Sequence, residues 1–281
     1  QFIFSYNSYT FQFNSHLCQS IILNLNMGCK INLVNGNIIT LDESCPSADT
    51  ISLENGKIAG INAIDHNHKS IDLQGATVIP GFTDSHFHLT NLGKQLDTLQ
   101  LKDCRSPREV AEKVLKKSAK MSHNDWIIGF GWDHNKWHEP NFPKADILNS
   151  LPISQPIMLN RIDGHSAWVN QKAMELSGLN VTPTPPDGGD IINDCILIDN
   201  AMNPVQFVMP KPDETIVEKW IKLALEIIIT RGITNIHDAW QDPITVKVLQ
   251  QLSEAGKLPI RIYGMLGSSH PKLLKHFFKE G

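Results

Sequence analysis

The hydrophobic pattern of the chain changes at Pro80-Gly81, and this change restricts the possible folds more than any other feature of the sequence. Upstream, short apolar runs are separated by Asn-Gly and Gln-Gly pairs, which supply the positive φ angles that tight turns need. Downstream, strand-like apolar runs alternate with segments of helical periodicity. The sequence therefore predicts a small, β-sandwich-like domain over residues 30–79 and an α/β domain over residues 80–281.

Three hairpins are predicted in the small domain, because three turn pairs each lie between two short apolar runs. The turn pairs are Asn35-Gly36, Asn55-Gly56 and Gln74-Gly75. Strands joined by such turns run antiparallel. We therefore expect an all-β domain of short antiparallel strands.

Residues 80–281 are expected to form the first part of a (β/α)-barrel. Strands are predicted at 126–130, 156–162, 233–236 and 259–266, and helices at 167–177 and from Ser106 and Asp213 onward. This alternation favours a parallel sheet, and the polar residues that follow the strands favour a barrel, whose chemistry lies at the carboxyl ends of its strands. A complete barrel takes roughly 250 residues, and this segment holds about five candidate strands, one of which is also compatible with an insertion. We therefore expect an incomplete barrel.

Composition and charge exclude several classes of partner. The net charge is −4 and no basic stripe is present, which argues against a nucleic-acid partner. No apolar run approaches the roughly 20 residues of a membrane span. The five cysteines are scattered and form no Cys-x-x-Cys pair. This pattern argues against a disulfide framework and favours a reducing compartment, hence the cytoplasm.

The first 26 residues contain no Lys, Arg, Asp or Glu. A secretory signal would need a positively charged start and a small-residue cleavage site, and neither is visible. We expect Met27 to be the natural start and residues 1–29 to be a disordered or non-native leader that is dispensable for the fold.

The strongest candidate for chemistry is the pair His86 and His88, at the end of the apolar run that leads from Val78 to Asp84. In an extended chain, residues two apart point to the same side, so both imidazoles face one point. Such a pair is a two-ligand corner for a divalent metal ion, zinc above all. The pair His66 and His68 has the same spacing but lies in a polar loop, and we expect it to bind no metal.

Polar residues also follow the strand predicted at 156–162. In one interpretation His165 lies at the mouth of the barrel, where it contacts the substrate or the metal-bound water, and Asp163 orients it. In the other interpretation this segment is only the first turn of a helix, with a structural histidine.

Two further pairs follow predicted strands. Trp132 and Asp133 begin an aromatic-rich loop, which either lines a substrate pocket or packs over the rim of the barrel. His237 and Asp238 follow the strand at 233–236, and a substrate-binding role and a structural role fit them equally.

The segment Pro80–His88, behind a small β-domain that contains residues 34–40, resembles the opening of the metal-dependent amidohydrolase superfamily. More specifically, it resembles amidohydrolase family 3, the branch that contains proteins like N-substituted formamide deformylase. Residues 161–170, 196–202 and 232–239 resemble the same branch. The resemblance extends from about Lys30 to the end of the chain.

This resemblance implies hydrolysis of a non-peptide carbon–nitrogen bond in a small-molecule amide. A metal-bound water, with its pKa lowered to near neutrality, attacks the carbonyl. The family takes further histidines and a proton-handling acid from later strands, which this sequence lacks. The chain is therefore interpreted as an N-terminal portion, with its general base elsewhere. The alternatives are a deaminase or cyclic-amide hydrolase of the same superfamily, or a non-catalytic truncated relative.

Overall fold

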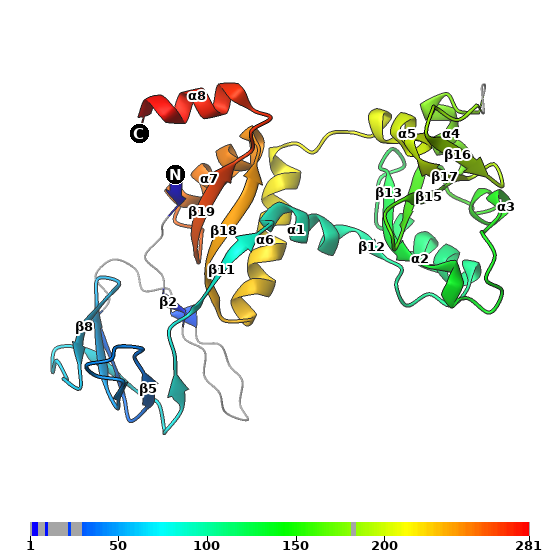
Figure 1. Ribbon diagram of the computed structural model, residues 1–281. Coiled ribbons are helices and arrows are strands. Elements are labelled where there is room, and N and C mark those ends of the chain that lie inside the picture. The colour runs from blue at the N-terminus through cyan, green and yellow to red at the C-terminus, as the bar shows by residue number, and fades with distance from the viewer. Residues whose placement is uncertain (1, 5–8, 11–21, 24–29, 181–183, 281) are drawn as a thin grey trace. The chain divides into compact units, whose positions relative to one another are not determined.

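The computed structural model describes residues 2–4, 9–10, 22–23, 30–180 and 184–280. The chain divides into two compact units (Figure 1). The first unit consists of residues 1–93 and 212–281, and the second consists of residues 94–211. Among the described residues, no helix is both long and apolar enough to cross a bilayer.

Residues 30–78 of the first unit form two small sheets. One has the order β8-β7-β4-β9 and the other the order β10-β5-β6. The strands are β4 (Lys30–Val34), β5 (Asn37–Ile39), β6 (Ser47–Ala48), β7 (Ile51–Glu54), β8 (Lys57–Ile61), β9 (Lys69–Asp72) and β10 (Thr77–Val78). Buried side chains from both sheets form a single cluster, with Leu33 and Leu53 from the first sheet and Ile38 and Val78 from the second. Each sheet thus buries apolar side chains against the other.

One of the three predicted hairpins is correct. The turn at Asn55-Gly56 joins β7 and β8, which pair antiparallel. The other two predictions are wrong, because β4 and β5 lie in different sheets, as do β9 and β10. At both places the chain crosses from one sheet to the other, and the crossings lie side by side, since the Gly75 N–H donates to the Asn35 carbonyl at 2.7 Å. The flanking strands consequently pair in parallel, β4 with β9 and β5 with β10.

The larger part of the first unit is a sheet of order β1-β19-β18-β11. Its parallel strands are β11 (Phe82–Phe87), β18 (Ile233–Gln241) and β19 (Arg261–Leu266). The short strand β1 (Phe2–Phe4) pairs antiparallel with β19, and β2 (Tyr9–Thr10) pairs with β3 (Ile22–Leu23). The prediction of a leader over residues 1–29 falls mostly outside the described residues. Of the residues in that range that the structure describes, Phe2–Phe4 pairs with β19 through the backbone.

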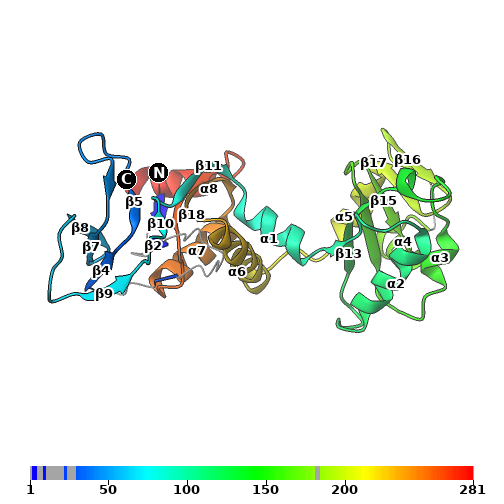
Figure 2. The same cartoon turned by 90° about the horizontal axis from the view of Figure 1, so that it is seen from below.

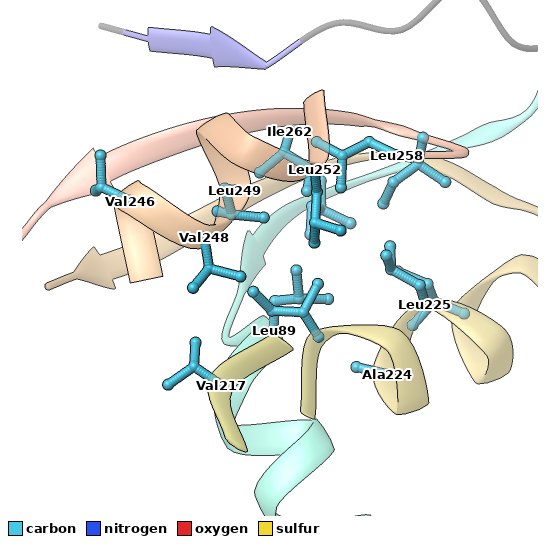
Figure 3. Close-up of a cluster of buried hydrophobic side chains, with 14 of the residues drawn as sticks. Leu89, Val217, Ala224, Leu225, Val246, Val248, Leu249, Leu252, Leu258 and Ile262 are labelled. Carbon is cyan, nitrogen blue, oxygen red and sulfur yellow. The ribbon is translucent and has the colours of Figure 1, made fainter. Parts of the chain in front are cut away.

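One face of this parallel sheet packs against helices (Figure 3). The helices of the unit are α6 (Glu214–Thr230), α7 (Pro243–Glu254), α8 (Pro271–Glu280) and the first half of α1 (Leu89–Asp97), whose residues from Lys94 onward belong to the second unit. Ile236 and Ile262 of the sheet meet Leu225 of α6 and Leu249 of α7 in one buried cluster. Each such side chain contributes about 1.5–3 kcal/mol when fully buried. This packing fixes the position of β11, which has the candidate metal ligands His86 and His88 at its end, and of β18, which carries His237 and Asp238.

The second unit contains a six-stranded sheet of order β12-β13-β14-β15-β17-β16. Its strands are β12 (Leu99–Gln100), β13 (Ile127–Trp132), β14 (Ile157–Arg161), β15 (Ser166–Val169), β16 (Gly189–Ile192) and β17 (Ile196–Asp199). Strands β12 to β14 pair in parallel, and the remaining pairs are antiparallel. The α-helices are α2 (Pro107–Ser118), α3 (Ala145–Asn149), α4 (Gln171–Ser177) and α5 (Asn203–Val208), and α2 and α4 contact the sheet (Figure 2).

This second sheet corrects the barrel prediction. The strands expected at 126–130 and 156–162 are β13 and β14, and they belong to the second unit rather than to the sheet of β11. The parallel neighbour of β11 is β18, although the whole second unit separates them in sequence. Strand–helix alternation is a local signal, which a barrel and a mixed sheet share, so it does not identify the neighbour of a strand. A closed barrel is not seen among the described residues.

The helix predicted at 167–177 is also partly wrong. Residues Ser166–Val169 form β15, and the helix α4 begins only at Gln171. All four residues of β15 are buried. A strand buried on both faces shows no alternation of apolar and polar residues, so its period cannot be distinguished from that of a buried helix.

Candidate functional site

The two histidines of the predicted metal corner lie close together at the carboxyl end of β11. The ring centroids of His86 and His88 are 5.0 Å apart and the rings meet edge to face. The pairing of β11 with β18 is irregular between Asp84 and Phe87, and the Asp84 carboxylate accepts the His86 backbone N–H at 3.1 Å. His86 is exposed and His88 is half-buried. The corner is therefore held by a local turn-like contact and is open on one side.

A buried carboxylate fixes the segment that follows the two histidines. Asp238, at the carboxyl end of β18, is 2% exposed and accepts the Leu89 backbone N–H at 2.8 Å. Leu89 is the first residue of α1, so Asp238 satisfies a helix N–H that has no partner within the helix. Burial raises the pKa of Asp238 to about 6, and the Leu89 N–H, nearby His88 and the Gln241 side chain oppose this rise. Asp238 therefore positions the backbone directly after His88, and its contact with substrate stays a prediction.

The neighbouring residue His237 lies on the opposite face of β18. It is half-buried, and its ring packs against the Tyr263 ring of β19 at 4.9 Å between centroids. The face of the sheet that carries His237 and Tyr263 is the one that the helices leave uncovered, because Ile236 and Ile262 point into the helical cluster. His237 thus stays available for contact with a ligand, which remains a prediction.

The described residues hold no group of three or more His, Cys, Asp or Glu side chains placed to bind a metal ion. His86 and His88 would supply two nitrogen ligands on one side of the strand, and this donor set fits zinc and similar ions. A catalytic zinc normally takes three protein ligands. The residues present therefore fit one part of a metal site.

One aromatic side chain beside the two histidines was not expected from the sequence. Trp240 stacks on His88, with 5.3 Å between ring centroids and 22° between ring planes, and its residue is 76% exposed. A regular strand pattern would have placed Trp240 on the buried face. Only the pairing of β18 with β19 reveals its true direction.

In the second unit, the ends of β14 and β17 form a charged network. Arg161 contacts the carboxylates of Asp163 and Asp133, the latter at 3.5 Å. Asp163 accepts the His165 backbone N–H at 3.1 Å, and His165 Nδ1 lies 2.9 Å from Asp199 Oδ1. The structure thus brings together three predicted residues and adds Arg161 and Asp199, whose roles the sequence did not indicate. The His165 side chain is 77% exposed.

The structure corrects the prediction that Trp132 lines a substrate pocket. Trp132 is fully buried, its indole N–H donates to the Leu159 carbonyl at 2.7 Å, and its ring packs against Trp137 and Trp168. Trp132 and Trp137 therefore pack in the core of the second unit, and Trp132 lines no pocket in this structure. Burial lowers the pKa of His134, which follows it closely, and the Arg161 guanidinium lowers that pKa further.

A family model described as "Amidohydrolase family" matches residues 69–280. The Bacillus subtilis protein named "Putative amidohydrolase YtcJ" is 27% identical over 247 residues, which cover 81% of this chain and 47% of that protein. The N-substituted formamide deformylase of Arthrobacter pascens is 23% identical over 263 residues, which cover 85% of this chain and 47% of that protein. The chain spans about half the length of these curated relatives.

Among solved structures, the chain is similar to an uncharacterized metal-dependent hydrolase from Pyrococcus furiosus. The TM-score is 0.73 at 23% sequence identity, and the match covers 89% of this chain and 52% of the other. At this level of identity the similarity concerns the fold.

Proposed function

The chain belongs to the amidohydrolase family, and from this membership we propose that it supplies part of the active site of a metal-dependent hydrolase. The reaction is the cleavage of a non-peptide carbon–nitrogen bond, of the amide or formamide type, in a small molecule. The observation that supports this proposal is the His86 and His88 pair, with ring centroids 5.0 Å apart at the carboxyl end of a parallel strand. In α/β-barrel enzymes this end of the strands carries the chemistry.

In this proposal His86 and His88 hold a divalent ion, with zinc favoured because imidazole nitrogens are among its preferred ligands. Such an ion supplies a water nucleophile that is active near neutral pH and polarises the substrate carbonyl. The chain's own residues keep the ligands in place. Asp84 holds the backbone of His86, and Asp238 holds the backbone just beyond His88.

The remaining ligands and the general base belong, in our proposal, to residues outside this chain. The described residues offer no third ligand beside the histidine pair, and the curated relatives are about twice as long as the part that matches. Residues 1–281 expressed alone should therefore bind zinc weakly and show no amidase activity above background. A zinc-loaded chain of these residues with turnover would contradict this, because the site would then be complete within it.

A second part of the proposal concerns the network of Asp133, Asp163 and His165. His165 Nδ1 is engaged by Asp199, so the exposed ring can offer Nε2 to a polar group of a ligand. The sequence resemblance covers this segment, and its exposed ring supports a role in substrate binding. Asp163→Ala should raise KM with little change in metal content, since Asp163 contacts the His165 backbone and no candidate metal ligand.

The proposal is tested by assaying the protein expressed from its complete coding sequence against N-formyl and N-acyl amines, with detection of the released amine. His88→Ala should abolish turnover, whereas His66→Ala should leave it unchanged. His66 is a matched control, because it belongs to a His-x-His pair of the same spacing in the small domain. Normal turnover in His88→Ala would show that the metal ligands lie elsewhere.

A further inference from the structure

We propose that Trp240 is a substrate-contacting residue that selects amides bearing a neutral aromatic or other planar apolar substituent. This inference rests on the proposed function, because it places Trp240 beside the histidine pair that would hold the metal ion. Three features of the first unit support it: a bulge that turns the side chain outward, a strained backbone, and stacking on His88.

The bulge is visible in the pairing of β18 with β19. Along β18, Thr234, Ile236 and Asp238 are buried while the residues between them are half-buried. This alternation would place residue 240 on the buried face. Instead, Asp238 pairs with Gly264 and Gln241 pairs with Leu266, so three steps on β18 oppose two on β19.

One extra residue in a strand reverses the faces of the residues that follow it. Gln241 accordingly takes the buried position, with 2% exposure, and Trp240 is left 76% exposed. The bulge thus presents an indole at the carboxyl end of the sheet, on the side of the histidines. Burial of apolar surface does not account for this, because an indole would be buried if the strand were regular.

The backbone of Trp240 has a φ of +58°, which bulky side chains rarely adopt. Glycine would occupy this position without strain. Strained residues of this kind are concentrated at sites where the direction of the side chain matters for function. In our proposal the strained backbone of Trp240 directs the indole toward a ligand.

The position of the indole defines the kind of ligand. One part of its surface stacks on the His88 ring, whose centroid is in turn 5.0 Å from that of His86. The rest of the indole surface is exposed beside the two histidines. Indole rings attract aromatic groups by stacking and cations through the π-system. A divalent ion at the histidines would repel a cationic substituent, so a neutral aromatic or planar apolar group is favoured.

The test compares substrates and variants in the protein expressed from its complete coding sequence. The ratio of kcat/KM for N-benzylformamide to that for N-methylformamide measures the preference for an aromatic substituent. Trp240→Gly removes the indole and keeps the bulge, because glycine adopts a φ of +58° freely. Trp240→Phe restores an aromatic ring. Phe278→Leu is the control, because Phe278 is an aromatic residue of the same unit with 84% exposure and lies on α8.

We expect Trp240→Gly to lower this ratio by about three- to tenfold, which corresponds to one aromatic contact. Trp240→Phe should retain most of the preference, Phe278→Leu should retain all of it, and the metal content should be unchanged in every variant. An unchanged ratio in Trp240→Gly would overturn the inference. So would loss of metal in that variant, because Trp240 would then act only by supporting His88.

A binding measurement separates this inference from the proposed function. If the protein hydrolyses neither formamide, the proposed function fails, and saturable quenching of tryptophan fluorescence by N-benzylformamide becomes the test. Quenching in the wild type that disappears in Trp240→Gly supports the aromatic contact. Absence of quenching in the wild type, or equal quenching in the variant, contradicts it.

Discussion

Two pairs of histidines in this chain have the same spacing and different geometry. His86 and His88 end a strand, and their ring centroids lie 5.0 Å apart. His66 and His68 lie in a turn, where His66 is exposed and His68 is buried at 7% exposure. Residues two apart share a side only when the chain is extended. Spacing therefore predicts a metal corner only where the backbone is a strand.

The two pairs also differ in how far along the chain the acidic residue beside each pair lies. Asp65 lies three residues before His68 and approaches its Nε2 at 3.3 Å. Asp238 lies 149 residues from Leu89, whose N–H it binds directly after His88. The first pair is thus supported by a local contact and the second by a tertiary contact between β18 and the start of α1.

The largest expected effect concerns metal binding. In the protein expressed from its complete coding sequence, His86→Ala should abolish bound zinc, because one ligand of the corner is lost. His68→Ala should leave the zinc content unchanged. Elemental analysis of both purified variants measures this difference. Equal zinc loss in the two variants would remove the distinction between the pairs.

The next effect concerns stability and pH. Burial raises the pKa of Asp238 from 3.8 to about 6, so the folded protein binds this proton more tightly than the unfolded chain does. The stabilisation from this difference is fully present below pH 3.8 and is lost as the pH rises to about 6, and the free energy of unfolding falls by roughly 3 kcal/mol over this range.

Asp238→Asn should remove this dependence. The neutral amide still accepts the Leu89 N–H, and Gln241 can rotate its side chain so that its unpaired Oε1 accepts from the new amide. Urea unfolding in the presence of a chelator should show the wild type losing stability relative to Asp238→Asn between about pH 4 and pH 6. A constant difference over this range would mean that Asp238 titrates near its ordinary pKa.

The smallest expected effect concerns the stability contributed by His66 and His68. His68→Ala should destabilise the protein by about 1–2 kcal/mol, because it empties a buried position in the small domain. His66→Ala should change stability by less than about 0.5 kcal/mol, as expected for an exposed residue. Thermal unfolding of the two variants tests this. A larger effect for His66 would show that its ring packs more than its exposure indicates.

The sequence predicted best where a residue acts on its own neighbours. Ser106 caps α2 by accepting the Glu109 N–H at 3.2 Å, and Asp213 caps α6 by accepting the Ile216 N–H at 2.9 Å. Gly178 ends α4 with a φ of +76°. These contacts span three or four residues, so a short window of sequence contains all the groups that make them.

The predictions were wrong where they concerned which strands pair with each other. The turn residues Asn35 and Gln74 have the positive φ angles that were expected, at +57° and +50°, yet neither turn makes a hairpin. Likewise, β13 and β14 have the hydrophobic pattern of barrel strands and lie in another sheet. A turn or a pattern fixes local angles and exposed faces, and these are compatible with several partners.

The amino-acid sequence was sufficient to predict that His86 and His88 lie close together at the end of one strand, because the two histidines and that strand are consecutive. Only the tertiary structure placed Asp238 behind Leu89 and Trp240 over His88, since both contacts join β18 to the region of β11 across the residues of the second unit. The physical reason is that strand register depends on hydrogen bonds between distant segments. One extra residue in β18, visible only against β19, decides whether Trp240 is buried or lies beside the histidines.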